Sequence, residues 1–287
     1  MNREIHPPMR PFSLNEALHL LKEYPDSILI SGGTHSYSYS EKPNQIEKKL
    51  PRPHYISLDR IEELRRISRT DRYLEFGAGV TLQRILQLGE SILPVPMRRC
   101  LEQIGSPGLR RLATIGGNLV IPESSIGLGI ASTVLDGSAE IRKYGSSRRI
   151  PVSRLYSTGT ALDAGEIITR IRIPNRMPTH SSYQRFGSPY DRTTHPLGIC
   201  GIAKVEKNSV ESFAFLTAAV NHPLIRNREL EADIVGQRVP LTEKEHQLFH
   251  DRWKKALQEH NLSDIQIERS TRLFAQFLIT LNRSRPL

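Results

Sequence analysis

The chain has 287 residues, of which 38% are hydrophobic, and its Lys and Arg outnumber its acidic residues by 40 to 30. This composition excludes a disordered chain and predicts a sizeable core in one large or several smaller domains. No apolar run reaches the roughly 20 residues of a membrane span, and the N-terminus lacks an apolar signal core, so we expect a cytoplasmic protein. Two cysteines, Cys100 and Cys200, are too few for a disulfide framework or for an iron–sulfur cluster held by this chain alone.

The positive charge is spread along the chain. Arginine pairs recur at 65–66, 98–99, 110–111 and 148–149, but they are mixed with acids and are not interleaved with aromatic residues. The sequence shows no helix-turn-helix, zinc-finger or RNA-binding pattern. We therefore interpret most of these charges as solvated surface and expect no nucleic-acid partner.

The N-terminal residues predict a small β-α-β unit. Ser13 and Glu16 have the spacing of a capping box at the start of a helix. The predicted apolar face of this helix consists of Leu14, Ala17, Leu18 and Leu21. Strands are predicted at 27–31 and 54–58, joined by a long polar surface connection at 36–53.

The rest of the chain predicts an α+β pattern without repeats. The strands predicted in its middle part are 72–78, 139–144, 148–152 and 166–173, and the helices are 81–88, 97–104 and 129–135. We expect a loop at 109–119 and a linker at 175–181.

The C-terminal part predicts two strands at 198–205 and 210–220, followed by helices. Two further capping-box pairs, Thr242 with Glu245 and Ser263 with Gln266, mark helix starts. The last helix has an apolar stripe that we interpret as core packing. Its members are Leu273, Phe274, Phe277, Leu278 and Leu281.

Two glycine pairs stand out, one at 31–36 and one at 109–119. Each lies beside an apolar run and next to polar residues. Glycines lack a Cβ, so the backbone can approach a ligand closely and its N–H groups can face phosphate oxygens. Two such loops suggest a diphosphate held between them. The alternative is that both pairs are simple turn glycines.

The sequence offers no catalytic residue and no metal site of its own. His246 and His250 are one helical turn apart, but no third ligand is evident, and we expect them to face solvent. The sequence has no G-x-S-x-G, Walker A or G-x-G-x-x-G motif. A bound cofactor is the expected source of any chemistry.

The two glycine motifs resemble those of a known family. Ser31-Gly32-Gly33-Thr34-His35-Ser36 is similar to A-G-G-T-D or A-G-G-H-S, and residues 113–119 read A-T-I-G-G-N-L without a change. Both are loops of the FAD-binding medium subunit of molybdenum hydroxylases, such as xanthine dehydrogenase and the carbon monoxide dehydrogenase flavoprotein. Segments 55–58, 76–81 and 135–137 also resemble this family.

The resemblance implies an α+β fold with two N-terminal subdomains that sandwich FAD, of the vanillyl-alcohol oxidase/p-cresol methylhydroxylase type, plus a C-terminal α+β domain. The implied boundaries are 1–57, 58–176 and 177–287. The implied partners are a molybdopterin-binding large subunit and a [2Fe–2S] small subunit, with NAD or another electron acceptor. The implied FAD-binding residues are Leu29, Ile30, Ser31, Gly32, Gly33, Thr34, His35, Ser36, Ile104, Thr114, Ile115, Gly116, Gly117, Asn118, Ile168 and Gln184.

Three positions depart from the family pattern. Gly127 stands where Asp is common, Glu123 where Ser is common, and Gln184 where a Lys can lie near the flavin ring. Two alternatives therefore stay open beside the FAD-binding electron-transfer subunit. One is a flavin-free scaffold subunit of the same fold, and the other is a stand-alone flavin reductase or oxidase.

Overall fold

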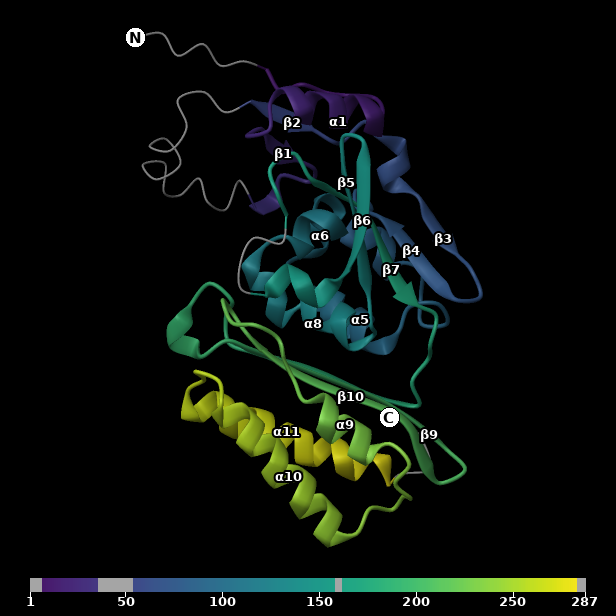
Figure 1. Cartoon of the computed structure of the whole chain (residues 1–287), viewed down its shortest axis with the longest axis vertical. Helices are drawn as coiled ribbons and strands as arrows, with labels where there is room; N and C mark the ends of the chain where they lie inside the picture. The colour runs from purple at the N-terminus through teal and green to yellow at the C-terminus, as the bar shows by residue number, and fades with distance from the viewer. Residues whose placement is uncertain (1–6, 36–53, 158–161, 283–287) are drawn as a thin grey trace.

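The computed structural model describes residues 7–35, 54–157 and 162–282, which form three β-sheets with helices packed against them (Figure 1). None of the helices in these ranges is long and apolar enough to cross a membrane.

The predicted N-terminal unit is present. Helix α1 (Leu14–Glu23) precedes strand β1 (Ile28–Ile30), which pairs in parallel with β2 (Tyr55–Ser57); the bridge from Met9 to Ile56 on the other side of β2 is also parallel. The Ser13 hydroxyl accepts the N–H of Glu16, as predicted, whereas the Glu16 carboxylate accepts the N–H of Phe12 rather than that of Ser13. The four residues of the predicted apolar face are buried. The connection 36–53 lies outside the described residues.

The middle part is built on a five-stranded antiparallel sheet. Its order is β3-β4-β7-β5-β6. The strands are β3 (Ile67–Arg69), β4 (Tyr73–Gly77), β5 (Ser138–Lys143), β6 (Ser146–Pro151) and β7 (Ile167–Pro174). All four predicted strands are confirmed. The additional strand, β3, is short and largely exposed, so it has no alternating apolar pattern to reveal it.

Helices pack against this sheet through one large apolar core. They are α4 (Leu82–Leu86), α5 (Val95–Glu102), α6 (Pro107–Leu112), α7 (Ile115–Leu119) and α8 (Leu128–Val134), with 3₁₀ turns at Glu62–Arg65, Pro122–Ile126 and Val152–Tyr156. The three predicted helices are confirmed.

The predicted loop at 109–119 is wrong. The segment belongs to α6 and α7, two short helices whose caps the prediction overlooked. The Ser106 hydroxyl accepts the N–H of Leu109 at 3.2 Å, and the Thr114 hydroxyl accepts the N–H of Gly117 at 3.2 Å. These caps start helices that glycine would otherwise disfavour.

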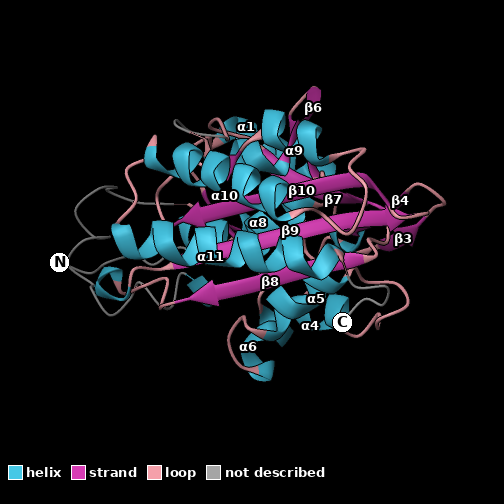
Figure 2. Ribbon diagram, turned by 90° about the horizontal axis from the view of Figure 1, so that it is seen from below, coloured by secondary structure: helices cyan, strands magenta, loops and turns pink. Residues whose placement is uncertain are grey.

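The C-terminal part has a four-stranded antiparallel sheet covered by helices. The sheet order is β11-β10-β9-β8, and its strands are β8 (His180–Phe186), β9 (Leu197–Glu206), β10 (Ser209–Ala219) and β11 (Ile225–Arg226). Helices α9 (Arg228–Ile234), α10 (Glu243–Gln258) and α11 (Asp264–Leu281) follow. Figure 2 shows α10 and α11 across one face of this sheet, and α5 and α8 contact the other face.

The C-terminal predictions are mostly confirmed. Both capping boxes are present, and four residues of the stripe on α11 are buried, with Leu273 packed at the edge of the same core. The predicted linker 175–181 is too long, because β8 already begins at His180. The apolar core of the middle part continues onto the face of the C-terminal sheet that α5 and α8 contact, where Tyr183 and Cys200 are buried. Middle helices and C-terminal strands therefore meet in a closely packed junction.

Candidate functional site

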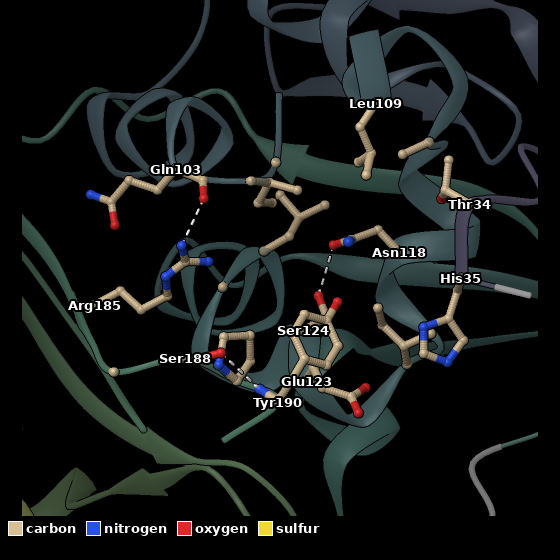
Figure 3. A pocket seen from close by; sticks show the side chains of 18 residues that line it. Thr34, His35, Gln103, Leu109, Asn118, Glu123, Ser124, Arg185, Ser188 and Tyr190 are labelled. Carbon is tan, nitrogen blue, oxygen red and sulfur yellow. Dashed lines mark hydrogen bonds between the residues drawn. The ribbon is translucent and has the colours of Figure 1, made fainter. Parts of the chain in front are cut away.

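A cavity of about 510 Å³ opens at this junction. Its walls come from the first glycine motif, from the segments around α5, α6 and α8, and from the turn between β8 and β9 (Figure 3). The predicted residues that line it are Thr34, His35, Ile104 and Asn118. A volume of this size is typical of a small-molecule or cofactor site.

The first glycine motif directly follows strand β1. Ser31 and Gly32 leave the sheet edge, Gly33 has a φ of 67°, and Thr34 and His35 are helical. Within the described ranges, the backbone N–H groups of Ser31, Gly32 and Gly33 donate to no protein acceptor. Consecutive free N–H groups of this kind form a concave site for an anion. Ser36 lies outside the described residues, whereas Leu29 and Ile30 are half-buried in β1.

The second glycine motif behaves differently, because protein acceptors already engage its backbone donors. The N–H of Ile115 donates to Val80 O and that of Gly116 to Ala78 O, both at 2.9 Å. The next two N–H groups, on residues 117 and 118, donate to the side chain and the carbonyl of Thr114. The motif thus anchors α7 to the segment after β4. The side chains of Thr114 and Asn118 are what it offers to a ligand.

Glycine is required in both motifs by contacts within the protein. A Cβ on Gly32 would lie 1.9 Å from the carbonyl oxygen of Leu112, and one on Gly116 would lie 2.6 Å from the Ala78 Cβ. Gly117 is more open, since its Cβ would meet only the Thr114 hydroxyl, at 3.0 Å. The structure therefore brings the two motifs together, as predicted, with Gly32 seated against the end of α6.

A second cavity of about 340 Å³ is lined by Ser31, Gly32 and Thr114. Three arginines at its wall make it basic, namely Arg65, Arg84 and Arg111. Its one carboxylate among the described residues, Asp59, is hydrogen-bonded to Arg10, which lowers the pKa of that carboxyl. Arg65 and Arg111 belong to the arginine pairs that we interpreted from the sequence as solvated surface. Only Arg111 carried a signal in the sequence, because it lies within the stretch 109–119 that holds the second glycine motif.

The C-terminal sheet contributes Arg185 rather than Gln184 to the main cavity. The Arg185 guanidinium donates to the carbonyl of Gln103 at 2.7 Å (Figure 3). Gln184 instead lines a separate cavity against α11, because successive residues of a strand point to opposite faces. Ile168 is buried in the core on β7 and does not line the main cavity.

The 3₁₀ turn after α7 lines the remaining wall. The Ser124 hydroxyl donates to the Asn118 side-chain oxygen at 2.9 Å, which fixes the Asn118 amide at the cavity surface. One oxygen of the Glu123 carboxylate is buried without a hydrogen-bond partner in the described structure. Gly127 adds open space beside it, because a Cβ there would have only Ser124 O at 3.7 Å and Cys100 Sγ at 3.9 Å nearby.

The described residues contain no group of three metal-ligating side chains. His246 is half-buried, and burial lowers its pKa. Both cysteines are buried, and burial raises the pKa of the Cys100 thiol to about 12. A thiol held protonated in this way is a poor nucleophile and a poor metal ligand.

Comparison with known families decides which ligand this arrangement serves. The family described as the FAD binding domain in molybdopterin dehydrogenase matches residues 4–176. The chain belongs to this family. Its cofactor is therefore FAD, and the predicted oxidoreductase class is confirmed at the level of the family.

Curated relatives of this FAD-binding chain agree. It is 29% identical over 184 residues to the nicotinate dehydrogenase FAD-subunit of Eubacterium barkeri, which covers 60% of the chain and 59% of that subunit. It is 24% identical over 183 residues to the putative xanthine dehydrogenase FAD-binding subunit XdhB of Escherichia coli K12 (62% and 60%). Aldehyde oxidase 2 of Cavia porcellus is 27% identical over 200 residues, 64% of the chain but only 15% of that protein. The chain thus spans from about one seventh to three fifths of these relatives.

Solved structures match over nearly the whole chain. Reconstituted CO dehydrogenase from Oligotropha carboxidovorans has a TM-score of 0.76 at 18% identity, covering 98% of this chain and 99% of that one. Quinoline 2-oxidoreductase from Pseudomonas putida 86 has a TM-score of 0.75 at 17% identity, with 98% of each chain covered. The predicted α+β fold class is confirmed.

Proposed function

We propose that the chain is the electron-transfer subunit of a molybdenum hydroxylase. In this role it takes electrons from a [2Fe–2S] small subunit, which a molybdopterin-binding large subunit reduces, and passes them to NAD or another acceptor. The observation that carries the proposal is the junction of the two glycine motifs. There, three backbone N–H groups of the first motif have no acceptor in the described part of the chain. They lie where the second motif packs, beside a large cavity and a basic one.

The residues at this junction fit FAD. The N–H groups of Ser31–Gly33 and the nearby arginine side chains suit the diphosphate, because anions bind to converging N–H donors and guanidinium groups. Thr34, His35 and Asn118 are placed to contact the part of FAD in the main cavity. When bound, FAD supplies the redox chemistry, and these residues hold and orient it.

Three other groups of the proposed site act indirectly. Leu29 and Ile30 lead into the first motif from β1, and Ile115 and Gly116 hold the second motif by packing. The N–H of Gly117 donates to the Thr114 hydroxyl, which caps α7. Ile104 gives the main cavity an apolar wall. Ile168 and Gln184 remain FAD contacts by resemblance only, and Arg185 takes the place in the cavity that the resemblance assigns to residue 184.

We propose that Arg185 places a positive charge at the cavity wall. Its side chain is half-buried, and among the described residues its guanidinium donates to the carbonyl of Gln103. A guanidinium there stabilises negative charge that develops on a bound cofactor. It also ties the C-terminal sheet to the middle part. We propose subdomains at 1–57, 58–176 and 177–287, and the end of the family match at residue 176 supports the last of these boundaries.

The proposed dependence on partner subunits follows from what the chain can hold. With two cysteines in the whole sequence, it cannot supply the four thiolates that hold a ferredoxin-type [2Fe–2S] cluster. We therefore expect no substrate hydroxylation by this chain alone, and we place it in the cytoplasm with its partners.

The decisive experiment is a visible absorption spectrum of the purified chain after incubation with FAD and removal of excess. We expect the two absorption bands of a bound flavin at about one FAD per chain. A colourless chain that stays colourless supports the flavin-free scaffold instead. If the chain without partner subunits rapidly oxidises NADH and reduces a substrate of its own, the result supports a stand-alone reductase.

A further inference from the structure

The most unusual side chain in the main cavity is that of Glu123. It belongs to the 3₁₀ turn Pro122–Ile126 and lines the cavity (Figure 3). Its Oε2 atom is buried and has no hydrogen-bond partner among the described residues. The neighbouring polar side chains do not help, because Ser124 donates to Asn118.

A buried oxygen without a donor costs free energy, and a carboxylate is the most costly case. The described residues supply no donor to this oxygen, and Gly127 leaves open space on the same wall. Because Glu123 lines the cavity, a molecule that fills it lies beside this side chain. Since an ionised carboxylate can only accept hydrogen bonds, the missing partner must be a donor. A phosphate, which would repel it, is excluded as that partner.

We propose that the Glu123 carboxylate accepts a hydrogen bond from a hydroxyl group of FAD, on the ribityl chain or on the ribose. The inference rests on the proposed function, in which FAD fills this cavity. The proposal assigns different parts of FAD to different parts of the site. The free N–H groups at Ser31–Gly33 and the basic cavity behind them receive the phosphates, whereas Glu123 receives a neutral hydroxyl further along the main cavity.

This assignment predicts that one substitution affects the stability of the FAD-free protein and the affinity for FAD differently. Without FAD, the buried Oε2 atom has no donor among the described residues, so Glu123→Gln should not lower the melting temperature. With FAD, the charged acceptor stabilises the complex, so the same substitution should weaken binding. A side chain with a purely structural role would move both quantities the same way.

The test uses FAD titrations of the full chain, followed by flavin fluorescence, together with thermal melts of the FAD-free protein. We expect the dissociation constant to rise by about tenfold or more in Glu123→Ala, as for loss of one hydrogen bond to a charged group. Glu123→Gln should lose less, because its amide oxygen still accepts. Glu259→Gln, on an exposed residue outside the cavity, is the matched control and should bind FAD like the parent.

Competition experiments locate the hydroxyl. A greater loss of FMN binding than of ADP binding in Glu123→Ala assigns the ribityl chain, and the reverse assigns the ribose. Unchanged or tighter FAD binding by both Glu123 variants overturns the inference, because the carboxylate would then be neutral or repulsive toward FAD. Failure of the parent itself to bind FAD refutes the proposed function, a result that the parent titration shows separately.

Discussion

The contact between Gly32 and the end of α6 gives the sharpest test of how the site is assembled. In Gly32→Ala, the new Cβ would lie 1.9 Å from the carbonyl oxygen of Leu112 and 2.7 Å from its carbonyl carbon. Non-bonded heavy atoms prefer separations of about 3.5–4.0 Å. Neither atom belongs to a flexible side chain, so the first motif or the end of α6 must move.

The expected cost has two parts. Overpacking of this kind destabilises a protein by about 1–3 kcal/mol, so the midpoint of urea unfolding should fall. Displacement of the N–H groups of Ser31 and Gly33 also weakens their hydrogen bonds to a charged ligand, each worth about 1.5–3 kcal/mol. Loss of one such bond corresponds to a rise of about tenfold or more in the dissociation constant of FAD.

Gly108→Ala is the matched control. Gly108 is exposed on α6, and the only neighbour of its new Cβ would be the Ser106 hydroxyl at 3.7 Å. Alanine in a helix is more stable than glycine by about 0.5–1 kcal/mol, so this variant should match or exceed the parent in stability. The reasoning fails if Gly32→Ala unfolds at the same urea concentration as the parent and binds FAD equally well.

Three further predictions concern the rest of the chain. Glu166 accepts two hydrogen bonds from Arg148, at 2.8 and 2.7 Å, which lower the pKa of this carboxyl below its usual 4.5. The ion pair therefore stabilises the folded protein fully above pH 4.5, and this contribution is lost as the pH falls through the lowered pKa. The free energy of unfolding of Glu166→Gln should therefore fall less steeply between about pH 5 and pH 3 than that of the parent, and an equal slope contradicts this assignment. In the C-terminal part, Ser270→Ala leaves the buried indole N–H of Trp253 without its acceptor and should cost about 1–3 kcal/mol in urea unfolding, whereas an unchanged midpoint would show that this bond contributes nothing. Both cysteines are buried, so a thiol reagent should count none in the native protein and two in denaturant, and fast native labelling would show that the junction around Cys100 opens.

The sequence by itself determined those features whose signals are local. A capping box spans only four consecutive residues, so Ser13, Thr242 and Ser263 could be identified as helix starts without knowledge of any tertiary contact. The two glycine motifs are also local, and their resemblance to the FAD-binding family was sufficient to predict FAD as the cofactor.

Other features depend on contacts between distant residues and could not be derived in this way. Helices α6 and α7 contain glycine and are short, so their own propensity is weak. Packing of Gly116 against Ala78 and hydrogen bonds to the segment after β4 hold α7 in place. The sequence indicated that backbone N–H groups would face the diphosphate. Only the tertiary structure shows that those of Ser31–Gly33 have no acceptor among the described residues, whereas those of 115–118 are engaged.

The tertiary structure also decided which side chains enter the cavity. Strand β8 is polar and has no alternating pattern, and its pairing with β9 determines which of its residues face the middle part. Tyr183 and Arg185 share that face, and Gln184 points to α11, because alternate residues of a strand lie on opposite sides of the sheet. A shift of one residue in this register would exchange Arg185 for Gln184 in the cavity. The residues of β8 do not indicate which register forms, because the register is set by pairing with β9.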